Sequence, residues 1–424
     1  MCIKYALRMS YTSVIIGGGI AGQLTAIALH KAGVGSVVYE AYDRTAEHAG
    51  AFLTLAVNAL DALQAVGIDV RGIGFETPRM TMTSGSGRRI GELTYGEPLA
   101  DGSVSRTVTR ADLYNLLRAE VVRRGIRIEY GKRLVDATGA EDGVRAEFAD
   151  GTMAEGDLLI GADGLRSRTR EVIDPAAPGT RYAGLVNTTG YARGVSTGCE
   201  PGVMHAIFGK RCFFVHITDP DGTVWWAANP AVPAERSPAE TSSVTSEQRR
   251  TRLWQLFRND RGPATSIIEA TEEILPDWNT YDVPTVPTWH RDGMIVIGDA
   301  AHATAPSIGQ GAAMAIEDGV VLAKCLRDCA EIPVAFTAYE TLRRERVERV
   351  VDQGNRTGGW KALPPLARIP RDAIMHLAMR RMARTGTDPS RWIYDHHIDW
   401  TAPVPESFPT GTRRAEPPKS TNSR

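Results

Sequence analysis

Cysteine is scarce in this chain: the 424 residues include five, an odd number without the spacing of a metal site. Such sparse use argues against a disulfide-rich secreted fold, and Cys325 and Cys329 are expected to be two buried thiols on one helix face. The sequence also contains no HExxH motif and no CxxC pair. These absences disfavour zinc-dependent hydrolysis and thiol redox chemistry, and no metal site is predicted.

A strong charge and a long apolar run are missing as well. The formal net charge is −1 and no dense basic stripe occurs, so nucleic acid is not an expected partner. The longest uncharged stretch includes residues 13–29, which are interrupted by four glycines and are better explained as a turn than as a membrane span. Because no secretory signal pattern is visible, we expect a cytoplasmic protein without membrane contact.

The first informative segment lies near the N-terminus. An apolar run at residues 13–16 leads into Gly17-Gly18-Gly19-Ile20-Ala21-Gly22 and then into a helical apolar pattern. This is GxGxxG in the strand, turn and helix setting that a dinucleotide site requires. Gly17 permits the tight turn, Gly19 lets the backbone approach a pyrophosphate, and Gly22 allows the helix to pack on the strand.

An acidic residue follows at the expected distance. The apolar run at residues 36–39 predicts a second strand, and Glu40 ends it. An acid there accepts hydrogen bonds from a ribose 2′-hydroxyl and repels a 2′-phosphate. The segment therefore predicts binding of FAD or NAD rather than NADP.

In each of two later segments, an apolar run that predicts a strand is followed by an Asp next to a Gly. The first is GADGLRSRTR at 161–170, and the second is IVIGDAAHATAPSIGQG at 295–311. Gly309-Gln310-Gly311 opens a helical pattern whose backbone N–H groups can stabilise negative charge. His302 in the second segment is expected to pack or to hydrogen-bond rather than to catalyse a reaction.

The three motifs in this order resemble the group A flavoprotein monooxygenases, the relatives of para-hydroxybenzoate and salicylate hydroxylases, over residues 13 to 350. The resemblance implies that Asp299 holds the ribityl chain of FAD, that the Asp163 segment serves FAD and the nicotinamide, and that Arg110 lies near the flavin. The full set of expected cofactor-binding positions is Gly17, Gly19, Ala21, Gly22, Glu40, Gly50, Ala51, Arg110, Asp163, Asp299, Pro306, Gly309, Gln310 and Gly311.

The same resemblance implies an activity. Its members are reduced by NADH or NADPH, form a flavin C4a-hydroperoxide with O2, and hydroxylate an aromatic small molecule, here expected to be phenolic or polycyclic. Epoxidation, Baeyer–Villiger oxidation and a non-catalytic flavin-binding accessory role stay open as alternatives. A halogenase is disfavoured, because Trp225-Trp226-Ala227-Ala228 lacks the WxWxIP pattern. The protein is expected to be a monomer or a homodimer.

The predicted fold is α/β, with a Rossmann-like FAD-binding domain interleaved with a mostly antiparallel β-sheet substrate domain and followed by C-terminal helices. The FAD-binding domain is assigned to residues 1–75, 105–177 and 285–340, and the substrate domain to 76–104 and 178–284. A helical segment at 341–402 and a disordered tail at 403–424 complete the chain.

Substrate recognition is assigned to one strand of the second domain. In residues 212–217 a period of two places Phe213, Val215 and Ile217 on one face, and Cys212, Phe214 and His216 on the other. We expect the mixed face to line the pocket, with Phe214 as an aromatic wall and His216 as a hydrogen-bonding or proton-transfer group. Trp226 and His205 are weaker candidates, and an ordinary sheet core is the alternative for each of these residues.

Overall fold

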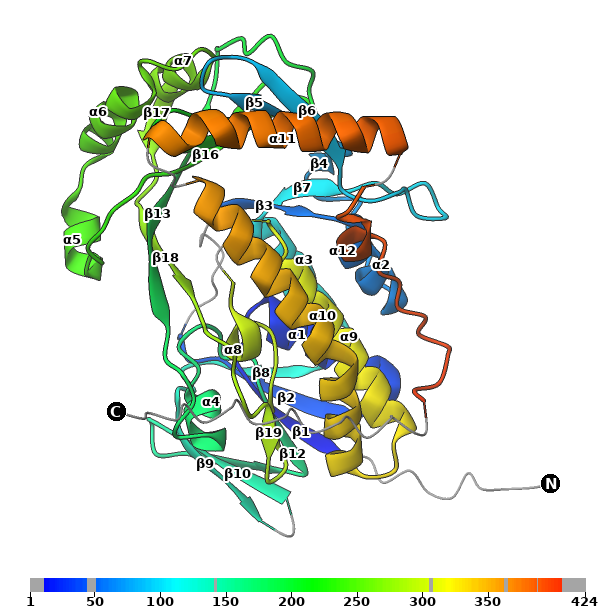
Figure 1. Cartoon of the computed structure of the whole chain (residues 1–424). Helices are drawn as coiled ribbons and strands as arrows, with labels where there is room; N and C mark the ends of the chain where they lie inside the picture. Colours follow the sequence, from blue (N-terminus) through cyan, green and yellow to red (C-terminus); the bar gives the residue numbers. More distant parts are fainter. Residues whose placement is uncertain are drawn as a thin grey trace, which may run out of the picture.

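The computed structural model describes residues 11–43, 51–140, 143–304, 308–361, 365–386 and 388–405. Its lower half in Figure 1 is built on a six-stranded sheet. β1 (Thr12–Ile16) lies inside this sheet and pairs in parallel with β2 (Gly35–Tyr39) and β12 (Leu158–Gly161). The outer strands are β8 (Arg127–Glu129) beyond β2, and β20 (Met294–Val296) and β19 (His290–Arg291) beyond β12.

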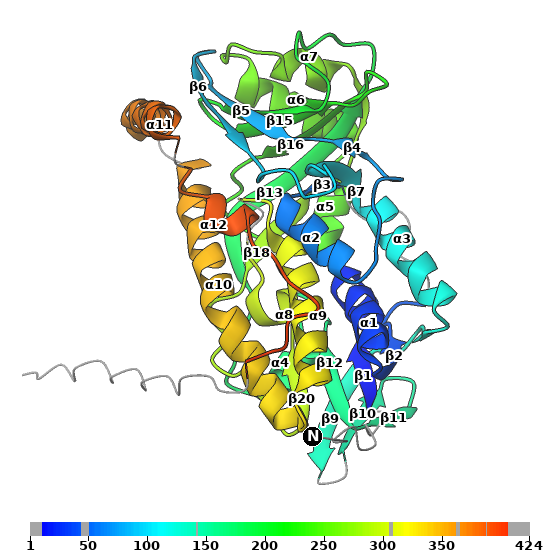
Figure 2. The ribbon, with the colours of Figure 1, turned by 90° about the vertical axis from the view of Figure 1, so that its right-hand side faces the viewer.

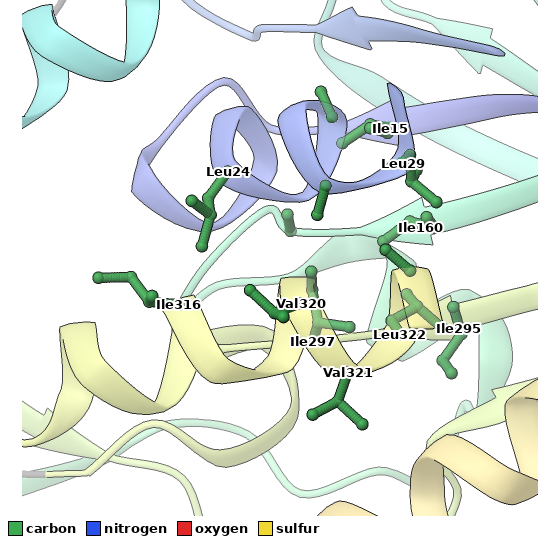
Figure 3. Close-up of a cluster of buried hydrophobic side chains, with 14 of the residues drawn as sticks. Ile15, Leu24, Leu29, Ile160, Ile295, Ile297, Ile316, Val320, Val321 and Leu322 are labelled. Carbon is green, nitrogen blue, oxygen red and sulfur yellow. The ribbon is translucent and has the colours of Figure 1, made fainter. Parts of the chain in front are cut away.

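Two long helices supply the core of this half. α1 (Ile20–Ala32) and α9 (Gly311–Asp328) pack on the sheet and on each other, and Figure 3 shows their apolar side chains meeting those of the strands. Ile15, Leu24 and Val320 are fully buried in this cluster. These residues come from the apolar runs of the sequence, which is why the predicted strand, turn and helix order forms here.

Further helices surround this core. α3 (Arg110–Arg123) packs beside α1, while α2 (Val57–Ala65) contacts α9. α10 (Ile332–Lys361) lies along α9 and runs without a break past residue 340, where the sequence prediction placed a domain boundary. The short helices are α4 (Arg168–Ile173), α8 (Asp299–His302) and α12 (Arg391–Tyr394).

The upper half contains an eight-stranded sheet whose neighbouring strands are antiparallel except for the parallel pair β14 and β5. Its strands are β5 (Arg79–Ser84), β6 (Arg89–Thr94), β13 (Arg181–Ala192), β14 (Val203–Phe208), β15 (Phe213–Thr218), β16 (Val224–Asn229), β17 (Thr271–Ile274) and β18 (Trp278–Asp282). We call the face covered by α6 (Ser246–Phe257) and α7 (Ala264–Glu269) the outer face, and the opposite face the inner face. α5 (Pro238–Ser243) precedes α6.

Smaller elements complete the fold. β3 (Phe52–Leu55), β7 (Arg106–Thr109) and β4 (Phe75–Glu76) form a short sheet that lies between the two halves in Figure 2. A three-stranded antiparallel sheet at the opposite end contains β9 (Leu134–Ala140), β10 (Gly143–Phe148) and β11 (Met153–Gly156). The predicted α/β class with C-terminal helices is confirmed.

The C-terminal region differs in part from its prediction. α11 (Pro365–Thr385) packs on β6, where Met375 is buried among sheet residues. The tail predicted to be disordered from residue 403 is ordered at its start, because Val404 is buried and its N–H donates to Asp328. Residues 406–424 lie outside the described part of the chain. None of the described helices has the length and apolar character needed to cross a membrane.

Candidate active site

Two glycines in the turn between β1 and α1 leave no room for a side chain. Gly17 has φ +103°, and a Cβ built there would lie 2.4 Å from the carbonyl oxygen of Ala162. A Cβ on Gly22 would lie 1.9 Å from the carbonyl oxygen of Gly17. Gly19 is different: it is the N-cap of α1, and a Cβ there would meet nothing within 4 Å. The helix N-terminus is therefore open to an anion at Gly19, as a pyrophosphate requires.

Glu40 stands next to this turn, at the end of β2. Its Oε2 accepts a hydrogen bond from the backbone N–H of Gly18 at 2.7 Å, and its Oε1 accepts one from Tyr42 at 3.0 Å. The carboxylate is thus held beside the open helix N-terminus, and Ala21 lies half-buried in the first turn of that helix. This arrangement fits the ribose-binding role predicted for Glu40.

Asp299 begins α8 and faces solvent. It makes no hydrogen bond or ion pair with any residue of the described ranges. The backbone around it is held from two sides, because Gly298 donates its N–H to Asp318 at 2.9 Å and Arg170 donates to the carbonyl of Ala300 at 2.9 Å. The Asp299 carboxylate therefore has no partner among the described residues and lies on a turn that is held in place. It can accept hydrogen bonds from the hydroxyl groups of a ribityl chain.

The Asp163 side chain is occupied within its own segment. One carboxylate oxygen accepts from Ser167 Oγ at 2.6 Å, and the other accepts from the N–H of Thr169 at 2.9 Å and from Thr169 Oγ1 at 3.0 Å. Burial raises the pKa of Asp163. The carboxylate thus stabilises the start of α4, and any contact of this segment with a cofactor is expected to come from its backbone.

Arg110 and Ala51 lie together, although about 60 residues separate them in the chain. The N–H of Arg110 donates to the carbonyl of Ala51 at 2.9 Å, and Thr109 Oγ1 caps α3 by accepting from Asp112 at 2.9 Å. The Arg110 side chain is exposed and has no hydrogen-bond partner in the described ranges. Gly50 and Pro306, two other expected cofactor positions, lie outside the described residues.

The N-terminus of α9 is open on one side and supported on the other. A Cβ on Gly309 or on Gly311 would meet nothing within 4 Å. Gln310, the N-cap between them, is buried, and its side-chain oxygen accepts from Asn58 Nδ2 at 3.0 Å. The first N–H groups of α9 can therefore meet a negatively charged group, while Asn58 holds the turn in place.

Asn58 connects this turn to a buried cluster of charged residues on α9 and α10. Its Nδ2 also donates to Glu317 at 2.7 Å, and Arg346 donates to Glu317 at 2.8 Å. Arg343 donates to Asp318 at 2.7 Å and also bonds Glu317. Burial alone would raise the pKa of Glu317, but Arg343 and Arg346 outweigh it and hold that pKa below its usual value.

His302 belongs to the same cluster. Its Nε2 lies 2.5 Å from Asp318 Oδ2, and its ring is buried against Trp289. The prediction that His302 packs and hydrogen-bonds is confirmed. Burial works to raise the pKa of Asp318, but His302 and Arg343 lower it further than burial raises it.

Sequence reasoning missed this cluster, although a signal was present. Glu317 and Asp318 interrupt an otherwise apolar helical pattern at 312–323. Acids at such positions are almost never buried without partners, so a basic residue from another element could have been expected. The identity of that residue, Arg343, depends on the packing of α10 against α9.

The structure corrects the predicted pocket wall. Phe214 is fully buried on the outer face, stacked on Trp226 at 5.4 Å between ring centroids and edge-on to Phe257 of α6 at 5.2 Å. Trp226 is also fully buried and donates its indole N–H to Thr271 at 2.8 Å. Both side chains lie in the core that the sheet forms with α6 and α7, which is the alternative that the sequence left open for these residues.

His205 and His216 lie on the same outer face, beyond the aromatic core. Their rings stack with centroids 5.0 Å apart. Burial, aided by the neighbouring His205, lowers the pKa of His216 to about 3. The predicted contact between His216 and a substrate hydroxyl is corrected as well, since the eight-stranded sheet separates His216 from β3 and the cofactor-binding turns.

The inner face meets the elements of the lower half. Trp225 contacts Phe75 at 5.1 Å, Tyr191 at 5.4 Å and Phe52 at 5.8 Å between ring centroids. Phe52 directly follows Ala51, one of the expected cofactor positions. Trp225, Tyr191 and Val215 are only half-buried, whereas their outer-face neighbours on the same strands are buried. Figure 2 shows this face turned toward β3 and β7.

The fold and the site define a flavoprotein built on a dinucleotide-binding sheet. Residues 10–354 match the family model described as an FAD binding domain, and the chain belongs to that family. The chain is an FAD-dependent monooxygenase, as its motifs indicated, with FAD as cofactor and NAD(P)H as the family's reductant.

Individual relatives agree with this assignment. The aurachin C monooxygenase/isomerase of Stigmatella aurantiaca is 29% identical over 83% of this chain and 90% of its own length. The FAD-dependent urate hydroxylase of Klebsiella oxytoca is 30% identical over 80% of this chain and 87% of its own. The crystal structure of Klebsiella pneumoniae HpxO complexed with FAD and uric acid superposes with a TM-score of 0.77 at 24% identity, covering 93% of this chain and 97% of that one.

Proposed function

We propose that the protein hydroxylates an aromatic small molecule, phenolic or polycyclic, with NADH or NADPH and O2. The observation that carries the proposal is the contact between Phe52 and Trp225, because it joins the cofactor-binding segment at Ala51 to an aromatic, half-buried wall. Bound FAD would supply the hydride-accepting and oxygen-activating chemistry. The relatives that hydroxylate urate and oxidise aurachin C support an aromatic substrate.

The protein's own residues would bind the cofactor and position the substrate. Glu40 and the N-terminus of α1 suit the ribose and the pyrophosphate, and Asp299 suits the ribityl chain. The N-terminus of α9 can stabilise the negative charge of a reduced isoalloxazine. Trp225 can stack on a flat substrate and exclude water from it.

Tyr191 is the polar group beside this wall. It is half-buried and meets Trp225 edge-on at 5.4 Å. Burial raises the pKa of Tyr191, so its phenol stays protonated at neutral pH and can donate a hydrogen bond. We therefore assign to Tyr191 the role of orienting an oxygen or nitrogen atom of the substrate.

The test is NAD(P)H oxidation by the FAD-loaded enzyme with a panel of phenols and fused heteroaromatic compounds. We expect slow consumption of NADH or NADPH without substrate, and faster consumption with a compound that is then recovered with one added oxygen. Epoxidation or Baeyer–Villiger oxidation would give a product of the same mass but different connectivity, which NMR of the product resolves. An FAD that neither nucleotide reduces, with or without any compound of the panel, would contradict the proposal.

Replacing Trp225 with alanine is expected to weaken substrate binding. Loss of one aromatic stacking contact costs about 0.5–1.5 kcal/mol, so KM should rise by about 2- to 10-fold. The fraction of NAD(P)H spent on hydrogen peroxide should rise as well, because the substrate is held less firmly. Steady-state kinetics combined with a peroxide assay measures both quantities.

Phe214→Leu is the matched control, since Phe214 lies on the outer face of β15, three positions before Ile217 of the inner face. It should lower the melting temperature while KM and coupling stay at their wild-type values. Unchanged kinetics in Trp225→Ala together with altered kinetics in Phe214→Leu would show that the outer face meets the substrate.

A further inference from the structure

Three side chains that commonly bind metals converge on the outer face of the eight-stranded sheet. They are Cys199, from the segment between β13 and β14, His205 of β14 and His216 of β15. One ligating atom from each residue lies within 4.8 Å of those of the other two. His205 and His216 are directly opposite each other on the two antiparallel strands, with their rings only 14° from parallel. Neighbouring strands thus present two imidazoles side by side.

The two histidines contain buried nitrogen atoms without a partner. Among the described residues, neither His205 Nε2 nor His216 Nδ1 has a hydrogen bond. His216 is 1% exposed, so bulk solvent does not reach its ring. An unsatisfied polar atom in such a place costs free energy and calls for an explanation. A bound cation that uses these lone pairs would provide one.

The other nitrogen of His205 is already oriented. Thr81 Oγ1 on the adjacent strand β5 lies 2.6 Å from His205 Nδ1. A histidine that binds a metal through Nε2 typically donates its Nδ1–H to an oxygen, which fixes the ring and leaves the Nε2 lone pair for the ion. Thr81 is placed to accept that hydrogen bond. It would act as a positioning residue for the ligand.

The third ligand determines the kind of metal. Cys199 is half-buried and free of any disulfide, and among the described residues its Sγ makes only one weak hydrogen bond, to the carbonyl of Thr197 at 3.4 Å. Cysteine and histidine together favour zinc over magnesium or calcium, which prefer oxygen ligands. In a tetrahedral zinc site the ligating atoms stand about 3.3–3.8 Å apart, so a shift of about 1 Å in the Cys199 segment would close the site.

We propose that Cys199, His205 and His216 bind one zinc ion that fastens the segment before β14 to the outer face of the sheet. Three protein ligands leave a fourth position for water. The site is separate from the flavin, since the sheet lies between it and the cofactor-binding turns. Its role is to stabilise this edge of the sheet, and it takes no part in the oxidation of the substrate.

The test uses the full-length, FAD-loaded protein, stripped of metal with a chelator and then given Zn²⁺ alone. We expect one zinc per chain by plasma mass spectrometry after dialysis. X-ray absorption at the zinc edge should show two imidazole nitrogens at about 2.0 Å and one sulfur at about 2.3 Å. Zinc should also raise the melting temperature of the wild type.

Variants localise the site. Cys199→Ser and His205→Gln should each weaken zinc binding by more than about 100-fold, beyond the 10- to 100-fold cost typical of a lost outer-shell partner. Cys329→Ser is the matched control, because Cys329 is another half-buried free thiol, and it should bind zinc as the wild type does. FAD content and basal NAD(P)H oxidation should be the same with and without zinc in all three.

Two results would overturn the proposal: a wild type that retains no zinc after dialysis, or Cys199→Ser and His205→Gln proteins that bind it with wild-type affinity. Neither result would bear on the monooxygenase activity, since the zinc readouts do not depend on turnover. His216→Ala is not used as the main variant, because a cavity at a fully buried position could unfold the sheet.

Discussion

Gly19→Val is expected to abolish FAD binding while the apoprotein stays folded. A Cβ at this position meets no protein atom within 4 Å, and the backbone there is extended with φ −74°, which valine adopts readily. The added side chain would instead occupy the space through which a pyrophosphate approaches the N-terminus of α1. Loss of two hydrogen bonds to a charged group costs about 3–6 kcal/mol, or more than about 100-fold in Kd.

Gly22→Val is the contrasting variant in the same turn. Its Cβ would lie 1.9 Å from the carbonyl oxygen of Gly17, so α1 must move away from β1 and the apoprotein itself should melt at a lower temperature. FAD titration followed by flavin absorbance, together with thermal melting of the apoproteins, separates the two effects. Wild-type FAD affinity in Gly19→Val would mean that the pyrophosphate does not approach α1 at this position.

Arg343→Met should lower the free energy of unfolding by about 3–5 kcal/mol. The guanidinium is 1% exposed and pairs with Glu317 and Asp318, whose side chains are fully buried. Removing one partner of such a cluster leaves uncompensated buried charge, and methionine keeps most of the apolar volume, so the loss reports the charge. The measurement is equilibrium unfolding in urea at pH 7.

The free energy of unfolding that Arg343→Met loses should depend on pH in a defined direction. Both carboxyl groups have pKa values lowered in the folded state, so their contribution to stability is present above their unfolded pKa, about 4, and is lost as the pH falls through the folded values. The difference between wild type and Arg343→Met should therefore shrink in acid. Arg123→Ala, which breaks an exposed pair with Glu120, should cost no more than about 1 kcal/mol at any pH. Equal losses in the two variants would contradict a buried, energetically important cluster.

The dinucleotide-binding half could be predicted because its signals are local. Glycines at fixed positions, one acid at Glu40 and the alternation of apolar runs lie within single strand–turn–helix units, and the structure places Gly17, Gly19 and Gly22 as their spacing implies. The helix caps at Thr109 and at Gly33 are local in the same sense.

The choice between the two faces of β15 could not be predicted, because each face carries a phenylalanine and other residues that suit a sheet core. Phe214 and Ile217 are equally compatible with a strand in a sheet core, and only α6, about 40 residues further along the chain, decides which face is covered. The same reason explains why two other features could not be predicted. They are the buried cluster of Glu317 with Arg343 and the group formed by Cys199 with His216. Each joins residues that become neighbours only through the packing of separate elements.

Turnover under ¹⁸O2, with mass spectrometry of the product, tests most directly whether the chain uses bound FAD to insert one atom of O2 into an aromatic substrate. We expect one labelled oxygen atom per product molecule, with the second labelled atom appearing in water. A product whose new oxygen derives only from H2O would contradict the proposed function.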